Sequence, residues 1–162
     1  MKVPERVLKA ITLGAIVGAS ALVAFFEGKS NTPYEDIVGV RTVCYGHTGR
    51  DIRDDTYSNA ECEAILQVDI DKANDVLNKY VTVPLSDSQR IALLSFIINV
   101  GEGSFKGSTL LRKLNRGDYL GACNELPRWV YAGGKTVKGL VTRREIEQIV
   151  CLGELNVLYD SD

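Results

Sequence analysis

The sequence predicts an α+β protein that is mainly α-helical. Two capping boxes, Ser58-Asn59-Ala60-Glu61 and Ser86-Asp87-Ser88-Gln89, are each followed by apolar residues at helical spacing. A β-branched run punctuated by glycine, residues 37–46, is typical of a twisted pair of strands. At 162 residues, the chain can form one domain, or two small lobes, around a buried core.

The first 26 residues have the charge pattern of an export or anchor signal. Lys2, Arg6 and Lys9 precede an uncharged run of seventeen residues, 10–26, which is close to the minimum that spans a bilayer. The basic flank is expected to stay in the cytoplasm, so the rest of the chain would face the periplasm. Nine of the seventeen residues are Ala, Gly, Ser or Thr, so lipid would hold the run only weakly. A cleaved signal peptide, a permanent anchor and a releasable anchor all fit this pattern.

A membrane-inserted run would hold Glu27, which follows it directly, at the membrane surface and outside any water-filled cleft. Release would then be a switch between two environments, lipid and the body of the protein. The apolar residues that would need new cover after release are Ile11, Ile16, Val17, Leu22, Val23, Phe25 and Phe26.

Glu27 is a candidate catalytic acid. Gly28 after it is expected to stop a helix, which would place the carboxyl at the negative end of the helix dipole and beside Phe25 and Phe26. Both the dipole and the loss of solvation disfavour a charged carboxylate, so we expect this group to keep its proton near neutral pH. A carboxyl of that kind can act as a general acid.

Two further polar residues could face the same bond. Asp36 is predicted to open the strand pair after a turn at Asn31-Thr32-Pro33, in a polar setting where it stays ionised. Thr42 lies six residues later, so in a continuous strand both side chains would share a face. The alternative is that Glu27 is a surface residue after a membrane segment and Asp36 an ordinary turn residue.

The remainder of the chain is predicted to be helical. A helix over about 59–79 would join two lobes, and the helix after Ser86 is apolar nearly all round, as expected in the middle of a bundle. Further helices are predicted over 105–115, over 118–126 before Pro127, and after a cap at Thr142.

Composition narrows the function classes. The net charge of −2, with mixed signs, argues against nucleic acid as the main partner. His47 is the only histidine and there is no CxxC pair, so we expect neither a metal site nor a cofactor. In an exported chain, four cysteines favour two disulfides, with three possible pairings, whereas a cytosolic chain would keep buried thiols. The cysteines are Cys44, Cys62, Cys123 and Cys151.

The spacing Glu27, eight residues, Asp36, five residues, Thr42, followed by Gly46-His47, resembles the catalytic signature of the phage-type lysozymes. More narrowly, residues 33–40 and 42–49 resemble the signal-anchor-release endolysins of lambdoid phages. The resemblance extends from Glu27 to Leu152, because residues 99–111, 128–134 and 139–145 match segments of the family's helical lobe and cleft wall. One departure is Arg41, where relatives carry an aromatic residue.

The resemblance implies the phage lysozyme fold, with a small antiparallel sheet lobe, a linking helix and a helical lobe over residues 27–162. It implies hydrolysis of the β-1,4 bond between N-acetylmuramic acid and N-acetylglucosamine in peptidoglycan, for host lysis. Glu27 would donate the proton, while Asp36 and Thr42 would hold the attacking water of an inverting enzyme. In a two-lobed fold the favoured disulfides are Cys44–Cys62 and Cys123–Cys151.

The resemblance also implies partners and a location. Residues 1–26 would be a signal-anchor-release segment, delivered by the host export machinery, with the N-terminus in the cytoplasm and the catalytic domain in the periplasm. A holin or pinholin that depolarises the inner membrane would release the enzyme, which we expect to be a monomer, into the periplasm.

Several residues are weaker candidates for substrate contact. Trp129 and Tyr131 could stack on sugar rings, although an aromatic residue after a helix is more often core. Arg128 and Arg144 could contact peptide carboxylates, or could form salt bridges. We expect His47 to be structural, bonded to backbone or near Asp36.

Two other functions fit the same sequence. A lytic transglycosylase cleaves this bond with a glutamate and no water, and the presence of Asp36 and Thr42 argues against it. A membrane-anchored module with this fold could instead bind the wall without cleaving it, since fold alone does not establish activity.

Overall fold

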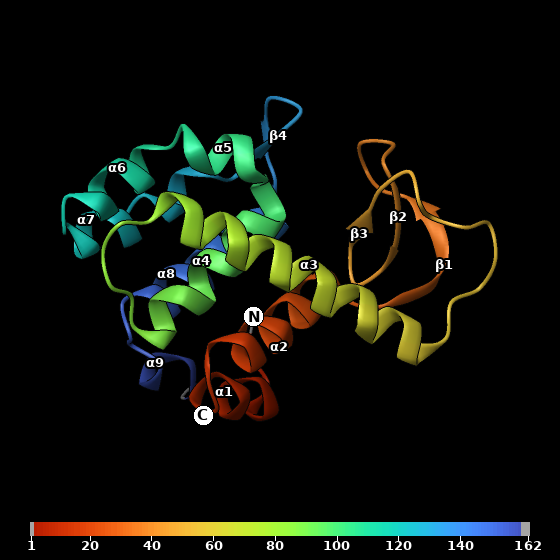
Figure 1. Ribbon diagram of the computed structural model, residues 1–162, viewed down its shortest axis with the longest axis horizontal. Coiled ribbons are helices and arrows are strands. Elements are labelled where there is room, and N and C mark those ends of the chain that lie inside the picture. The colour runs from red at the N-terminus through yellow and green to blue at the C-terminus, as the bar shows by residue number, and fades with distance from the viewer. Residues whose placement is uncertain (1, 160–162) are drawn as a thin grey trace.

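The computed structural model describes residues 2–159 and shows two lobes joined by a long helix (Figure 1). The smaller lobe contains an antiparallel sheet and the larger one is helical. The joining helix, α3 (Asn59–Tyr80), begins beside the sheet and ends in the helical lobe. The fold is therefore mainly helical α+β, as the sequence predicts.

The helical lobe is built from segments on both sides of α3 in the chain. Its helices are α1 (Glu5–Thr12), α2 (Ala15–Glu27), α4 (Asp87–Val100), α5 (Glu102–Lys106), α6 (Thr109–Asn115), α7 (Tyr119–Cys123), the 3₁₀ helix η1 (Leu126–Arg128), α8 (Lys138–Cys151) and α9 (Asn156–Tyr159). A hairpin of β4 (Tyr131–Ala132) and β5 (Lys135–Thr136) lies between η1 and α8. The first helices and the last long helix thus meet in one lobe.

The sheet contains β1 (Ser30–Glu35), β2 (Arg41–Cys44) and β3 (His47–Thr48), antiparallel and in that order. Two details differ from the expectation. Asn31-Thr32-Pro33 lies inside β1 rather than in a turn, because an edge strand tolerates a proline that cannot donate a hydrogen bond. Asp36 follows β1 and begins the turn to β2, so it does not open a strand.

The apolar run of residues 10–26 does not form one helix. α1 ends at Thr12 and α2 begins at Ala15, and Gly14 between them has φ 134°, which residues with a side chain rarely adopt. The two helices pack against each other, and α2 packs against α4. Within residues 2–159, no helix has both the length and the apolar character needed to cross a membrane. The expected N-terminal anchor helix is therefore not present in this fold.

Most apolar side chains of this run are covered by the helical lobe. Ile11, Leu22 and Val23 belong to the main core, while Ile16, Phe25 and Phe26 pack against it from partly buried positions. Val17 is the exception, with half of its surface exposed. The first segment therefore packs as part of the lobe.

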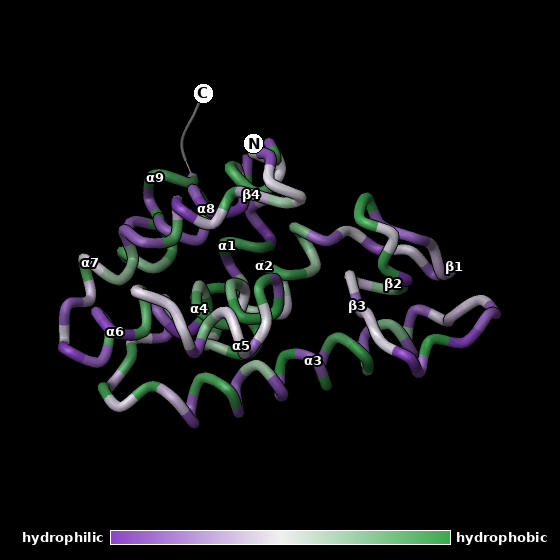
Figure 2. Tube along the Cα trace, turned by 90° about the horizontal axis from the view of Figure 1, so that it is seen from above, coloured by the Kyte–Doolittle hydropathy of each residue, from purple (hydrophilic) through white to green (hydrophobic). Residues whose placement is uncertain are grey.

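α4 lies at the centre of the helical lobe, where the sequence places a helix that is apolar nearly all round. Seven of its residues in succession, Ile91–Ile97, are buried. Figure 2 shows hydrophobic colouring concentrated in α2 and α4, whereas hydrophilic and hydrophobic positions alternate along α3. This difference fits a central helix and a bridging helix with one solvated face.

Three helix boundaries differ from the sequence prediction. The helix expected over 105–115 is divided into α5 and α6, because Ser108 accepts a hydrogen bond from the backbone of Leu111 and caps a new helix. The helix expected over 118–126 becomes α7 followed by η1. α8 begins at Lys138 instead of near Thr142, whose hydroxyl donates to the carbonyl of Lys138 within the helix.

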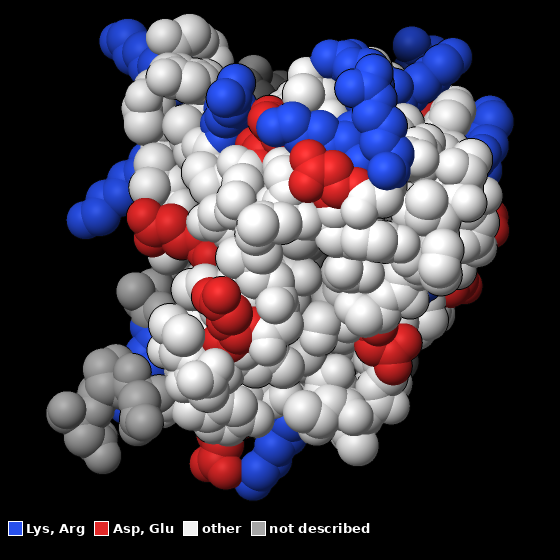
Figure 3. Space-filling view, turned by 90° about the vertical axis from the view of Figure 1, so that its left-hand side faces the viewer, with Lys and Arg blue, Asp and Glu red and all other residues white. Residues whose placement is uncertain are grey.

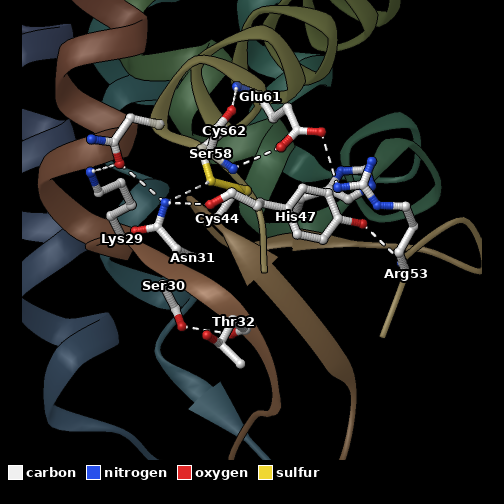
Figure 4. Close-up of a disulfide and its surroundings, with 12 residues drawn as sticks. Lys29, Ser30, Asn31, Thr32, Cys44, His47, Arg53, Ser58, Glu61 and Cys62 are labelled. Carbon is white, nitrogen blue, oxygen red and sulfur yellow. Dashed lines mark hydrogen bonds and ion pairs between the residues drawn. A yellow bond between two sulfur atoms is a disulfide. The ribbon is translucent and has the colours of Figure 1, made fainter. Parts of the chain in front are cut away.

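Each lobe contains one disulfide, in the pairing favoured from the sequence. Cys44–Cys62 joins β2 to α3, and Cys123–Cys151 joins α7 to α8. Figure 4 shows the first of these beside Asn31, whose side-chain amide donates to the carbonyl of Tyr57 and to the side chain of Asn59. These contacts fix the sheet on the first turn of α3.

Candidate active site

A cleft of about 1140 Å³ lies between the two lobes. Glu27 lines it at the end of α2, and Asp36, Ile37 and Val38 line it from the β1–β2 turn. The opposite wall comes from the helical lobe, with Asn99, Val100, Ser104, Arg128, Trp129, Tyr131 and several residues at the start of α8. The two candidate carboxylates therefore border one cavity that is large enough for several sugar rings.

Glu27 is the last residue of α2, and Gly28 after it has φ 64°, as the expected helix stop requires. The Glu27 side chain is 25% exposed, and its Oε1 accepts a hydrogen bond from Arg143 Nη1 at 2.5 Å. The Arg143 guanidinium also lies over the ring of Phe26, with its central carbon 4.9 Å from the ring centroid. The helix end and the aromatic rings around Glu27 are predicted from the sequence, whereas this cation is not.

The backbone of Gly46 lies against the Glu27 carboxyl, close to Oε2. Its φ is 76°, and a Cβ at this position would lie 2.6 Å from Glu27 Oε2. Contacts this short are essentially never seen for real Cβ atoms. The carboxyl is thus held between the backbone of Gly46 and the guanidinium of Arg143.

A buried charge network holds Arg143 in place. Its side chain is 6% exposed, and Nε donates to Glu147 Oε1 at 3.1 Å while Nη2 donates to the carbonyl of Ser95 at 3.0 Å. Glu147 is fully buried and also accepts from the hydroxyl of Ser95 at 2.7 Å and from Arg144. The two arginines thus share Glu147 as a buried partner, and Arg143 also contacts Glu27.

Arg144 belongs to this network and not to the open cleft surface. Its side chain is 1% exposed, and it donates to Asn99, to Glu147 and to the carbonyl of Trp129 at 3.0 Å. Burial lowers the pKa of this guanidinium, and Glu147 opposes that effect. The structure therefore favours the salt-bridge interpretation of Arg144 over contact with substrate.

Asp36 is fixed by the turn that follows β1. Its Oδ1 accepts hydrogen bonds from the backbone N–H of Val38 at 2.9 Å and of Val40 at 2.8 Å. Oδ2 has no hydrogen-bond donor among the described residues, and the side chain borders the cleft. A carboxylate held in this way can accept a proton from a water molecule in the cleft.

Thr42 lies in β2, across the hairpin from the end of β1, where it pairs with Tyr34. The expectation that Thr42 and Asp36 share one face of a continuous strand is therefore wrong. Thr42 is 3% exposed, it does not line the cleft, and its hydroxyl donates to the carbonyl of Val40 at 2.9 Å. The N–H of Val40 donates to Asp36, so Thr42, by bonding the Val40 carbonyl, supports the turn that positions the Asp36 carboxylate.

The remaining candidates lie on the helical wall. Arg128 and Tyr131 are largely exposed and line the cleft, and Arg128 lies 3.4 Å from Glu125. Trp129 packs edge-on against Phe96 in the core, at 5.3 Å between ring centroids. The structure thus leaves Arg128 and Tyr131 available to a ligand.

His47 and Arg41 lie outside the cleft. The two ring nitrogens of His47 lie 2.8 Å from Asp69 and 3.3 Å from Asp51, so its partners are neither backbone nor the surroundings of Asp36. Arg41 forms an ion pair with Asp54, which ties β2 to the loop before α3. Among residues 2–159, no three His, Cys, Asp or Glu side chains gather as a metal site requires.

Three residues of this site are not predicted from the sequence: Arg143, Glu147 and Gly46. A signal was present, because Arg143, Arg144 and Glu147 are charged residues on the side of α8 that packs in the core. Charged groups on a buried helix face are seldom accidental, since each needs a partner. Gly46 could be singled out only once its distance to Glu27 was known.

Comparison with known proteins places this site in a family. Residues 24–147 match the family model described as phage lysozyme. The chain is 52% identical over 155 residues to a SAR-endolysin of Bacteriophage PS119, covering 91% of this chain and 93% of that protein. The muramidase domain of SpmX from Asticaccaulis excentricus has a similar structure, with a TM-score of 0.75, 27% identity, and coverage of 83% of this chain and 94% of that one.

A second solved structure supports the fold. The active form of the P1 phage endolysin Lyz superimposes with a TM-score of 0.75 and covers 96% of this chain and 97% of that one, at 22% identity. The similarity thus includes both lobes and the N-terminal helices.

Proposed function

Since the chain belongs to the phage lysozyme family, we propose that it is an endolysin that hydrolyses the β-1,4 bond between N-acetylmuramic acid and N-acetylglucosamine in host peptidoglycan. The observation that carries the proposal is the cleft, in which Glu27 and Asp36 border one cavity from different segments. Relatives named SAR-endolysin over almost the whole chain support the role in lysis.

In the proposed mechanism, Glu27 protonates the departing glycosidic oxygen. Asp36 accepts a proton from a water that attacks the opposite face of the sugar, which gives inversion. Thr42 acts through the Val40 peptide, whose N–H holds Asp36 and whose carbonyl accepts the Thr42 hydroxyl. Arg143 keeps the Glu27 carboxyl in place through its hydrogen bond, and the Phe26 ring lies against the same guanidinium.

We further propose that residues 1–26 are a releasable anchor and residues 27–162 the catalytic body. In the membrane, residues 10–26 would form one helix and hold Glu27 at the bilayer surface. After release, a bend at Gly14 lets α1 fold back on α2 while α2 packs on α4, and the end of α2 then delivers Glu27 to the cleft. Delivery by the host export machinery and triggering by a holin or pinholin belong to this proposal.

The first experiment measures release of reducing ends from purified peptidoglycan by the full-length chain, with Glu27→Gln as the comparison. We expect cleavage by the parent alone, with both proteins folded by circular dichroism and of full intact mass. Cleavage by Glu27→Gln would overturn the assignment of the acid, and 1,6-anhydro ends would identify a transglycosylase.

The release proposal has a separate test. Depolarising the inner membrane of cells that express the protein should move the uncut chain from the membrane to the periplasmic fraction. A chain that stays with the membrane, or that appears only in a shortened form, would rule out a releasable anchor.

A further inference from the structure

Positive charge is concentrated in one stretch of the chain. Residues 104–144 contain nine Lys or Arg and two Asp or Glu, a net charge of +7, whereas the whole chain carries −2. The residues outside this stretch therefore carry −9. Such asymmetry points to a partner that is itself charged.

Two of the nine, Arg143 and Arg144, are buried in the network beside Glu27. The other seven are at the surface of α5, α6, η1, the β4–β5 hairpin and the start of α8. α5, α6 and the hairpin lie along the top of the helical lobe in Figure 1, and Figure 3 shows Lys and Arg side chains gathered along this edge. This basic face consists of Lys106, Arg112, Lys113, Arg116, Arg128, Lys135 and Lys138.

Little of this charge is neutralised within the protein. Glu125 is the acidic residue inside the face, and it lies 2.6 Å from Lys113 and 3.4 Å from Arg128. Asp118 is used differently, because its carboxylate caps α7 by accepting from the N–H of Gly121. Five members form no ion pair with any described residue: Lys106, Arg112, Arg116, Lys135 and Lys138.

The basic face is continuous with the cleft, since Arg128 and Lys138 line the cleft and also belong to the face. A glycan strand in the cleft carries a peptide stem on each N-acetylmuramic acid, and these stems end in free carboxylates. Stems that leave the cleft over this wall would pass across Arg128 and Lys138 toward α6.

We propose that the basic face binds the carboxylates of the peptide stems and so holds the anionic wall against a protein that is acidic elsewhere. This inference rests on the proposed function, because the glycan must lie in the cleft. The charges act together at the surface, where each pair alone is weak, and salt screens them over about 10 Å at 0.1 M. The attraction should therefore depend steeply on salt and on the charge of the wall.

The test compares two triple variants in the inactive Glu27→Gln background. The first is Arg112→Gln/Arg116→Gln/Lys135→Gln, which removes three charges from the face without touching the cleft. The matched control, Arg6→Gln/Arg50→Gln/Lys72→Gln, removes three exposed charges elsewhere and gives the same net charge. Binding is measured by pelleting with purified sacculi at several salt concentrations, with sacculi whose carboxylates have been amidated, and with phosphatidylglycerol vesicles.

We expect the face variant to bind sacculi about tenfold more weakly than the control at low salt. The difference should disappear at high salt and on amidated sacculi. Equal binding by both variants would overturn the proposal, as would a loss that persists on amidated sacculi. A loss confined to the vesicles would assign the face to lipid phosphate instead. Binding is measured in variants that do not cleave the wall, so the result does not depend on activity. If the parent releases no reducing ends, the proposed function is refuted, and the comparison of the two triple variants still tests whether the basic face binds carboxylates.

Discussion

Replacing Gly46 by alanine should displace the proposed catalytic acid while leaving the fold intact. The new Cβ would lie 2.6 Å from Glu27 Oε2, whereas ordinary contacts begin at 3.4 Å, so the carboxyl must move by about 0.8 Å. The Cβ would also lie 2.8 Å from Cδ and 2.9 Å from Cγ of Glu27, so the outer part of this flexible side chain moves while the backbone can stay in place. The shift should be costly for activity, because it moves the carboxyl out of the position that its hydrogen bond to Arg143 fixes, from which we propose that it protonates the glycosidic oxygen.

The expected loss follows from that displacement. A misplacement of about 1 Å in a catalytic group can cost about 10²-fold in rate, so we expect kcat for reducing-end release to fall roughly 100-fold. Alanine at φ 76° also strains the backbone by about 1–2 kcal/mol, which urea unfolding would detect.

Gly117→Ala is the matched control for this substitution. Gly117 has φ 79°, and an added Cβ meets nothing within 4 Å, so this variant carries the same backbone strain without the collision. It should lose similar stability and keep full activity. If Gly46→Ala retains kcat within about threefold of Gly117→Ala, close approach at Gly46 does not position Glu27, and the reasoning is refuted.

Three further predictions concern stability and release. Glu147→Gln removes the buried carboxylate that Arg143 and Arg144 share, so the free energy of unfolding measured by urea titration should fall by about 3 kcal/mol; a midpoint equal to that of the exposed Glu154→Gln would contradict the network. Serine at both Cys123 and Cys151 opens a link with a sequence separation of 28 and should cost about 3–4 kcal/mol in the same assay, whereas a loss below about 1 kcal/mol would show that packing of α7 on α8 suffices. Gly14→Ala disfavours the bend at φ 134° and suits a continuous helix, so release after depolarisation should slow several-fold; release at the parent rate would show that the bend does not limit it.

Local signals predicted the elements with well-defined ends. The capping box at Ser58 is present with both of its hydrogen bonds, and α3 covers 59–80 against an expected 59–79. The glycine after Glu27 ends α2 as expected, because a positive φ there requires no partner from elsewhere in the chain. In these cases the interactions that end or begin the helix involve only a few neighbouring residues.

Contacts between distant segments could not be predicted in this way. Thr42 lies across a hairpin from Asp36 because the turn falls between them, and even spacing along a continuous strand does not apply through a turn. The break at Gly14 depends on a core that α1 and α2 can cover, which hydropathy alone does not reveal. Arg143 meets Glu27 only because α8 packs beside α4, opposite the end of α2.

The pairing of Glu27 with Arg143 joins residues 116 positions apart in the chain. On the proposed mechanism, the acid is therefore held in place only when α2 and α8 have both docked on α4. A nascent, truncated or partly inserted chain would lack one half of this pair and stay harmless to the cell that makes it. The enzyme would thus become active only after synthesis and folding are complete. The time of lysis would then depend on when the chain leaves the membrane.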